Sequence, residues 1–367
     1  MLHLNLDKYL IACPLIACTV LSSCNLTKEE TRIYANDPML ITMGRTIYTE
    51  CDSILNFNFP GSAIYANFSG TKVSMLARPG SGSFIYTLDG QEPKRVEFDE
   101  NVREIILADS LEDKEHSIEI MYIIEGYEHN PGFAGLRLSP GAKLTKKHQL
   151  PDFKILYIGN SITCGYGIES DNPNEGFSYA TENHYSTYAA ITARNVNAQW
   201  HSISRSGIGV YRNYGDKREG SEVTMPIQFE RTLFDNPNYQ WNHSDYQPDL
   251  ICLNLGTNDT SLDNYDVDKL RDAYVSFVGT LREEYPNSKI LLLTGSMMNG
   301  KALDDAKTSL DFTLNHYTEK GDSLIYRFDF SPQGGDLGYG ADWHPSKAQH
   351  ARMAEELTEY IKTTVIN

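Results

Sequence analysis

The sequence predicts two domains, an all-β sandwich followed by an α/β domain built on a parallel sheet. The length of 367 residues fits two domains at about 150 residues each. Residues 31–140 contain short β-rich runs separated by turn signals, whereas strand-like and helical stretches alternate from residue 151 onward. The composition, with 40% hydrophobic and 22% charged residues, is typical of a globular protein and excludes collagen-like, disordered and multi-span membrane classes.

The N-terminus resembles a secretory signal. Lys8 precedes an apolar run that is too short to span a bilayer as a mature helix. The run ends in Leu21-Ser22-Ser23-Cys24, which resembles the lipobox of bacterial lipoproteins with Cys24 as the lipidated residue. We expect a signal at 1–23, a polar tether at 24–30, and a secreted lipoprotein of the cell envelope, on the outer membrane, held by its lipid anchor only. An ordinary signal peptide with a chance cysteine is the alternative.

The first domain is expected to be a sandwich of the jelly-roll kind over 31–140. Asp89-Gly90 between two strand-like runs is a strong hairpin signal. Residues 141–150 are polar and are expected to form a linker. The strand-like runs of this domain include 62–68, 72–77, 83–88, 103–108 and 117–124.

The second domain, 151–367, is expected to place helices on both faces of a parallel sheet, an α/β/α arrangement. Ligands of such sheets bind at the carboxyl ends of the strands. Strands are expected at 154–158, 249–255, 289–294 and 323–329, and helices at 185–195, 266–285 and 346–363.

Cysteine usage and charge exclude several function classes. Outside the signal only Cys51, Cys164 and Cys252 occur, without metal-ligand spacing, so neither a disulfide framework nor a metal site is expected, although one bridge among the three stays open. Lys and Arg total 32 against 49 Asp and Glu, which gives a net charge of −17. Nucleic acid binding needs a basic footprint, so we expect no nucleic acid partner and favour a neutral substrate.

Four polar motifs follow β-elements of the second domain. Ser161 follows a buried strand and a glycine, and Gly207 lets the backbone approach a ligand closely. Asn258 offers a side-chain N–H to a developing oxyanion, and His344 is suited to general base work near neutral pH. Taken singly, each also fits a helix cap, a turn or a structural histidine.

The order Ser, Gly, Asn and His in one α/β domain resembles the SGNH (GDSL-type) hydrolase superfamily, whose name gives these four residues. The resemblance implies an SGNH-type three-layer α/β/α fold with Ser161 as nucleophile and His344 as base. It also implies an oxyanion hole made by the backbone N–H groups of Ser161 and Gly207 and the side chain of Asn258. The superfamily usually has Asp before the serine, where this sequence has Asn160.

Longer motifs resemble carbohydrate esterase family two, which also carries a β-sandwich before its SGNH domain. This resemblance implies removal of O-acetyl groups from plant polysaccharides such as xylan or glucomannan, without metal or cofactor. The motifs are Asn160-Ser161-Ile162-Thr163-Cys164-Gly165-Tyr166-Gly167, Tyr211-Arg212-Asn213-Tyr214-Gly215 and Asp342-Trp343-His344-Pro345-Ser346, with shorter ones at 182–185, 225–226, 231–232, 248–250 and 256–259.

The residue that orients His344 is left open by the sequence. Many SGNH enzymes have the triad aspartate three residues before the histidine, where this chain has Ala341, while Asp342 lies two before. Either Asp342 completes a triad, or a main-chain carbonyl orients the ring and a Ser–His dyad operates. Trp343 and Tyr211 are candidate sugar contacts, as is Trp241, with packing roles as the alternative.

Two other functions fit parts of the same pattern. One is hydrolysis of another acyl ester, a lipid or a thioester, by the same residues. The other is glycan binding by a surface lipoprotein without turnover, against which the complete set of four residues counts.

Overall fold

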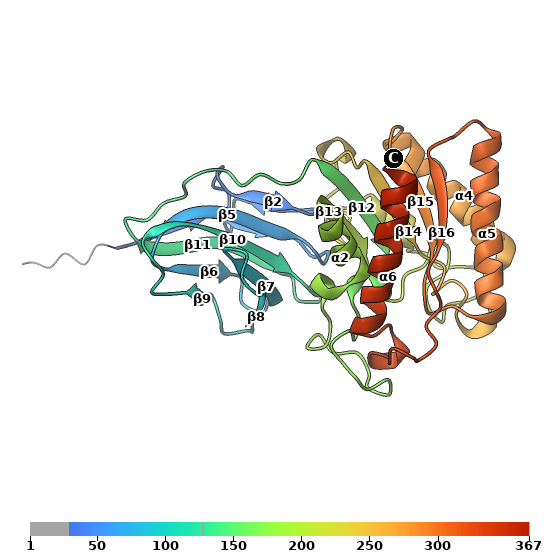
Figure 1. Ribbon diagram of the computed structural model, residues 1–367, viewed down its shortest axis with the longest axis horizontal. Helices are drawn as coiled ribbons and strands as arrows, with labels where there is room; N and C mark the ends of the chain where they lie inside the picture. Colours follow the sequence, from blue (N-terminus) through green and yellow to red (C-terminus); the bar gives the residue numbers. More distant parts are fainter. Residues whose placement is uncertain (1–28, 127, 367) are drawn as a thin grey trace, which may run out of the picture.

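The computed structural model describes residues 29–126 and 128–366. An elongated β-domain lies end to end with an α/β domain (Figure 1). The first described residues lie at the end of the β-domain that is remote from the α/β domain. In the described part of the chain, we find no helix whose length and apolar character would let it cross a membrane.

The β-domain is a sandwich of two antiparallel sheets, as expected from the sequence. One sheet has the strand order β3-β4-β11-β6-β9, with β1 also paired to β11, and the other has the order β2-β5-β10-β7-β8. The strands are β1 (Glu30–Tyr34), β2 (Ile41–Met43), β3 (Ile47–Thr49), β4 (Ile54–Asn56), β5 (Ala63–Gly70), β6 (Val73–Ala77), β7 (Gly82–Leu88), β8 (Lys94–Phe98), β9 (Glu104–Ala108), β10 (Lys114–Tyr122) and β11 (Gly132–Pro140).

Aromatic rings fill the sandwich where its sheets face each other. Phe84 packs edge-on against Phe57 and Phe98, with ring centroids 6.2 and 5.8 Å away. The hairpin signal at Asp89-Gly90 is confirmed, because β7 and β8 pair antiparallel and both turn residues have positive φ, 51° and 69°.

The second domain has a five-stranded, wholly parallel sheet in the order β13-β12-β14-β15-β16. Its strands are β12 (Phe153–Gly159), β13 (Ala198–Ser204), β14 (Leu250–Asn254), β15 (Lys289–Thr294) and β16 (Ile325–Asp329). Its helices are α1 (Ser161–Cys164), α2 (Tyr188–Asn195), α3 (Met225–Phe229), α4 (Val267–Glu284), α5 (Gly300–Glu319) and α6 (Lys347–Tyr360), with one-turn 3₁₀ segments at His184–Ser186, His243–Asp245, Ser261–Asp263 and Ala341–Trp343 and a π-turn at Ile361–Val365.

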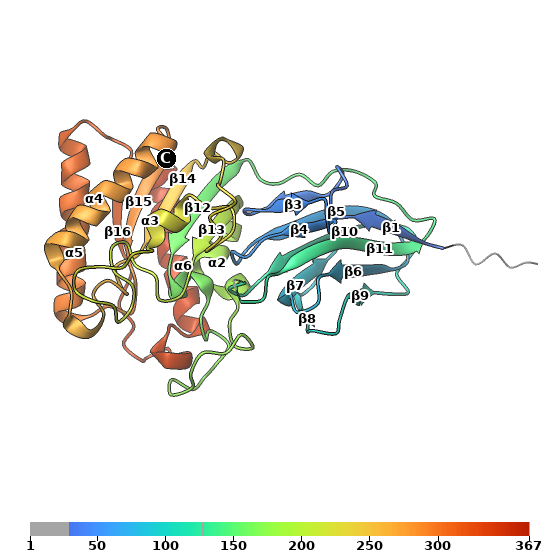
Figure 2. The same ribbon diagram turned by 180° about the vertical axis from the view of Figure 1, so that it is seen from behind.

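The side chains of alternate residues in each strand point to opposite faces of this sheet. Tyr157 and Leu291 share a core cluster with residues of α2 and α6, whereas Leu156 and Leu292 pack with residues of α3, α4 and α5. Accordingly, α6 lies in front of the sheet in Figure 1, and α4 lies in front of it in Figure 2, which is the view from behind. The predicted α/β/α layering is confirmed.

The two domains share one apolar core. The cluster that includes Phe57 and Phe84 of the sandwich continues into Tyr157 and Tyr188 of the α/β domain. Residues 141–150 contain no regular element, and Lys143 runs beside β5, where its carbonyl accepts a 2.9 Å hydrogen bond from Ser69.

Candidate active site

The candidate nucleophile, Ser161, is the first residue of α1 and follows β12 by two positions. Asn160 caps this helix, because its side chain accepts a 3.1 Å hydrogen bond from the Ile162 N–H. Gly159 lets the strand turn tightly into the helix, since a Cβ there would lie 2.0 Å from Thr163 Oγ1. The turn leaves Ser161 7% exposed at the carboxyl edge of the sheet.

His344 lies against this serine. Its Nε2 is 2.9 Å from Ser161 Oγ, and its Nδ1 is 3.1 Å from the main-chain oxygen of Ala341. A carbonyl only accepts, so Nδ1 carries the proton and Nε2 faces the serine hydroxyl as an acceptor. Burial lowers the pKa of His344 to about 4, so the ring is neutral near neutral pH. These features suit a general base.

The chain before His344 turns through two residues of left-handed conformation. Asp342 and Trp343 have φ values of 48° and 60°, which are unfavourable for non-glycine residues. The turn is held at its start, because the Ala341 N–H donates a 3.2 Å hydrogen bond to the Gly167 carbonyl. Gly167 permits this approach, since a Cβ there would lie 2.6 Å from that of Ala341. The turn brings the Ala341 carbonyl to the Nδ1 edge of the histidine ring.

Tyr166, a residue to which the sequence assigned no role, covers the other side of the base. Its ring stacks on His344 with centroids 4.0 Å apart and 19° between the planes. Its hydroxyl donates a hydrogen bond to the Asp342 carboxylate, and this contact together with burial raises the pKa of Tyr166. Tyr166 therefore fixes both the ring plane of the base and the neighbouring acid.

Gly207 and Asn258 lie on the loops that follow β13 and β14, the two strands that flank β12. Gly207 has a φ of 76°, and its carbonyl accepts a 2.8 Å hydrogen bond from the Tyr214 N–H. Asn258 donates one hydrogen of its amide to the Ile208 carbonyl at 2.8 Å, which leaves the second available to a ligand. The sheet thus brings the predicted Ser, Gly, Asn and His motifs to one edge.

Buried hydrogen bonds of Asp259 and Arg212 join these two loops. The Asp259 carboxylate accepts hydrogen bonds from the backbone N–H groups of Val210, Tyr211 and Arg212 at 3.1, 2.8 and 3.0 Å. In return, the buried Arg212 guanidinium donates to the Asp259 carbonyl at 3.0 Å. Both residues lie in motifs noted in the sequence, but their reciprocal bonding is visible only in the structure.

Comparison with known proteins decides the family. The family model for "Carbohydrate esterase 2 N-terminal" matches residues 42–147, and that for "GDSL-like Lipase/Acylhydrolase" matches residues 155–357. An acetylxylan esterase / glucomannan deacetylase of Cellvibrio japonicus is 30% identical over 352 residues, covering 93% of this chain and 94% of that protein. The chain belongs to the family two carbohydrate esterases.

Other relatives agree with this assignment. The cellulase/esterase CelE of Acetivibrio thermocellus is 34% identical over 305 residues, which are 82% of this chain but only 37% of that protein. A Clostridium thermocellum family two carbohydrate esterase, solved with cellohexaose, superposes with a TM-score of 0.82 at 32% identity, covering 89% of this chain and 99% of that one. The present chain, as a member of this family, is a carboxylic ester hydrolase.

Of the two arrangements that the sequence leaves open for Asp342, the geometry matches the one in which a main-chain carbonyl orients the histidine. The Asp342 carboxylate accepts a hydrogen bond from Tyr166, and the proton of His344 Nδ1 points to the Ala341 carbonyl. The extended backbone that would place residues two apart on the same side is absent here, because Asp342 and Trp343 are both left-handed. The esterase has the geometry of a Ser–His dyad.

The predicted sugar contacts divide into one exposed residue and two packed ones. Trp343 is 53% exposed and lies next to the base. Tyr211 instead uses its hydroxyl to accept a 2.7 Å hydrogen bond from the Asp266 N–H at the start of α4. Trp241 lies under the Arg45 guanidinium, 4.8 Å from the ring centroid. Tyr211 and Trp241 thus each make a contact within the fold, and both are half-buried.

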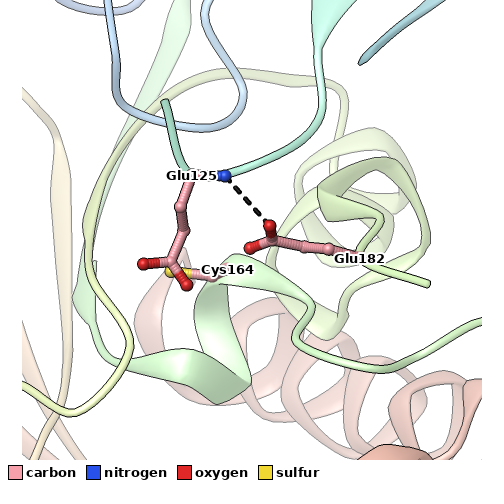
Figure 3. A group of neighbouring side chains, drawn as sticks. All are labelled: Glu125, Cys164 and Glu182. Carbon is pink, nitrogen blue, oxygen red and sulfur yellow. Dashed lines mark hydrogen bonds between the residues drawn. The ribbon is translucent and has the colours of Figure 1, made fainter. Parts of the chain in front are cut away.

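One cluster in the described residues brings three metal-ligating side chains within 4.8 Å of one another: Glu125, Cys164 and Glu182 (Figure 3). Burial and the neighbouring Glu125 raise the pKa of Glu182, and burial raises that of Cys164, which favours the uncharged form of each. The Glu125 carboxylate is already occupied, because Arg205 donates to it at 2.5 Å. A carboxylate already paired with an arginine, beside two groups whose uncharged forms are favoured, is poorly suited to a cation.

Proposed function

We propose that this protein is a serine esterase that removes O-acetyl groups from plant cell-wall polysaccharides, xylan or glucomannan, through an acetyl-enzyme on Ser161. The observation that carries the proposal is the 2.9 Å hydrogen bond between Ser161 Oγ and a neutral His344 in a chain of this family. The named substrates of its Cellvibrio japonicus relative support the choice of polymer.

In the proposed first step, His344 Nε2 takes the Ser161 proton while Oγ attacks the acetyl carbonyl carbon. The new C–O bond gives a tetrahedral oxyanion, and its collapse breaks the bond to the sugar oxygen, which leaves with the proton from His344. Water then attacks the acetyl-enzyme with the same base, and acetate and free serine result. The Ala341 carbonyl stabilises the imidazolium that forms in each step.

The oxyanion is proposed to receive the backbone N–H groups of Ser161 and Gly207 and the free hydrogen of the Asn258 amide. Such donors act on charge that develops only in the transition state, and loss of one costs roughly 3 kcal/mol in measured cases. The hydrogen bonds between Asp259 and Arg212 join the two loops that carry Gly207 and Asn258.

Exposed aromatic rings around the base suit a neutral sugar chain. Phe177 and Trp343 are 40% and 53% exposed, and Phe177 packs 4.8 Å from the Tyr166 ring. Planar rings offer apolar faces to sugars without demanding charge. The net charge of −17 likewise favours a neutral polymer over a polyanion.

The decisive experiment measures acetate release from acetylated xylan and acetylated glucomannan by the wild type and Ser161→Ala. We expect release by the wild type, with the ratio of the two rates identifying the preferred polymer, and none above background from the variant. Absence of release from both polymers by folded protein would overturn the proposal.

The same protein samples address the alternatives. Hydrolysis of a long-chain 4-nitrophenyl ester faster than the acetate ester would favour a lipid substrate. Retention of the polymer on Ser161→Ala and wild type alike, without acetate release, would favour glycan binding.

We further propose that Cys24 is lipidated and that 24–30 tether the enzyme to the cell envelope. These residues, apart from 29 and 30, lie outside the described part of the structure, and the proposal is based on the Leu21-Ser22-Ser23-Cys24 motif. Radiolabelled palmitate should enter the wild type and not Cys24→Ala; equal labelling would contradict the proposal.

A further inference from the structure

One buried carboxylate of the β-sandwich domain, that of Glu125, hydrogen-bonds to residues of the α/β domain. We propose that Glu125 is a positioning residue of the esterase, which holds the Arg205–Ser206–Gly207 segment so that the Gly207 N–H points into the oxyanion hole. The inference rests on the proposed function, because it assigns that hydrogen bond donor to catalysis.

Glu125 follows β10 at the end of the sandwich that faces the α/β domain and is 2% exposed. Both of its oxygens are used by the segment after β13. Oε2 accepts a 2.9 Å hydrogen bond from the Ser206 N–H and forms a 2.5 Å ion pair with Arg205 Nη1. Oε1 accepts a hydrogen bond from the Ser206 hydroxyl. One carboxylate from the first domain thus binds two consecutive residues of the second.

These bonds control the peptide that carries the catalytic N–H. The Gly207 N–H belongs to the peptide unit directly after Ser206, whose own N–H and side chain are both fixed by Glu125. Beyond Gly207, the Tyr214 N–H holds the Gly207 carbonyl at 2.8 Å. Glycine at φ 76° has wide conformational freedom, so an ordered donor there needs anchors on both sides.

The Glu125 backbone is itself held, so the carboxylate is not a flexible surface group. Its N–H donates to Glu182 Oε2 at 3.1 Å (Figure 3). On either side, the Ile123 carbonyl accepts a 2.9 Å hydrogen bond from the His184 N–H, and the Gly126 N–H donates to the Asn58 carbonyl at 3.1 Å. The position of this carboxylate is therefore set by contacts within and between the two domains.

The charges of the cluster support this role. Burial raises the pKa values of Glu182 and Cys164, which favours their uncharged forms, while the Glu125 carboxylate forms an ion pair with the Arg205 guanidinium at 2.5 Å. A neutral side chain at position 125 would leave the Arg205 cation without this counter-charge and would weaken the hydrogen bonds to Ser206.

The test compares Glu125→Gln with wild type in steady-state hydrolysis of 4-nitrophenyl acetate, with rates normalised to active sites titrated by an organophosphate. Glu119→Gln is the matched control, because Glu119 is a half-buried carboxylate in β10, six residues before Glu125, whose side chain accepts a 3.2 Å hydrogen bond from the Tyr65 hydroxyl and not from the oxyanion-hole loop. Thermal unfolding of each variant reports whether the fold is retained.

We expect Glu125→Gln to lower kcat by roughly 10- to 100-fold, less than complete loss of one oxyanion donor, with KM changed less than twofold. Glu119→Gln should leave kcat within twofold of wild type. Adding Ser206→Ala to Glu125→Gln should lower kcat little further, because both substitutions act on the Gly207 N–H. Adding Asn258→Ala to Glu125→Gln should instead multiply the two losses in kcat, because Asn258 is a separate donor. If Glu125→Gln does not fold, Ser206→Ala alone should lower kcat about 3- to 10-fold at constant KM.

An unchanged kcat per titrated site in folded Glu125→Gln would overturn the inference, as would an unchanged kcat in Ser206→Ala where the first variant does not fold. Failure of the proposed function is distinguishable. In that case wild type and Ser161→Ala release acetate equally slowly, whereas failure of the inference alone leaves wild type active and Ser161→Ala inactive.

Discussion

At the scale of single residues, the proposed base, His344, is oriented by a main-chain carbonyl and not by an acid. The proton on His344 Nδ1 points to the Ala341 oxygen at 3.1 Å, and the Asp342 carboxylate accepts from Tyr166. A peptide carbonyl has no pKa in the working range and cannot be lost by protonation, so this arrangement keeps the tautomer fixed as the pH falls.

Replacing Asp342 with asparagine tests this geometry. Asparagine tolerates the left-handed backbone at φ 48° and still accepts from Tyr166. We expect kcat for acetate release to fall less than roughly 100-fold, against the about 10⁴-fold loss in a triad that depends on its acid. His344→Ala serves as the control for full loss of the base; an Asp342→Asn variant as inactive as this control would indicate a triad.

The pH dependence of kcat/KM provides a second test at this scale. Because burial lowers the pKa of His344 to about 4, the ring is the neutral, active base above that pH and becomes protonated below it. Activity should therefore persist as the pH falls from 7 to about 5 and be lost as the pH falls through about 4. Acetate release followed across this range, with circular dichroism to verify folding, checks the value. Half-maximal activity near pH 6.5 would contradict it.

The sequence predicts the side chains of the site better than its backbone contacts. The motifs single out Ser161, Gly207, Asn258 and His344 as candidates, and the structure brings Ser161 and His344 into hydrogen-bond contact. The role of Ala341 has no side-chain signal, and it arises from the left-handed turn at the next two residues. Glu125 was missed because its partners are 80 and 81 positions away in another domain.

At the scale of elements, the loops after β13 and β14 depend on each other. Asp259 accepts backbone hydrogen bonds from three residues of the first loop, and a fourth from Gly256 at 3.2 Å. This buried carboxylate thus satisfies backbone N–H groups of both loops, as the partner strand does for a strand in a sheet.

We expect Asp259→Ala to destabilise the enzyme by about 3 kcal/mol or more, because several buried N–H groups lose their acceptor at once. Urea unfolding measures this as a lower midpoint. Asp259→Asn, which keeps one acceptor oxygen, should lie between the variant and wild type. A midpoint for Asp259→Ala within experimental error of wild type would show that water replaces the carboxylate.

The elements themselves were predicted with uneven success. The strand expected at 289–294 matches β15, and the helix expected at 266–285 matches α4 within one residue at each end. The 20-residue α5 was not predicted. Its buried face consists of Ala306, Ser309, Leu310 and Thr313, and with small and polar residues on that face the apolar period is too weak to detect.

At the scale of the whole molecule, the two domains form one unit of stability. The apolar core is continuous between them, and the buried Arg45 of the sandwich donates to the carbonyls of Phe229 and Arg231 in the α/β domain, each at 2.5 Å. Neither domain can unfold without exposing part of the other.

Calorimetry of residues 24–367 should therefore give a single transition, with equal calorimetric and van't Hoff enthalpies. Arg45→Ala, which removes an interface contact, should lower the midpoint of that transition without splitting it. Two resolved transitions in the wild type would contradict a shared core.

The end-to-end arrangement also sets the reach of the enzyme. The first described residues lie at the outer end of the sandwich, and α6, which follows His344, begins at the lower edge of the other domain in Figure 1. β10 and β11 have nine residues each, about 30 Å of extended chain. If the molecule is held by its N-terminus, the sandwich would place the α/β domain about that length away from the point of attachment. Such a distance would leave room for a polymer strand between the supporting surface and the α/β domain.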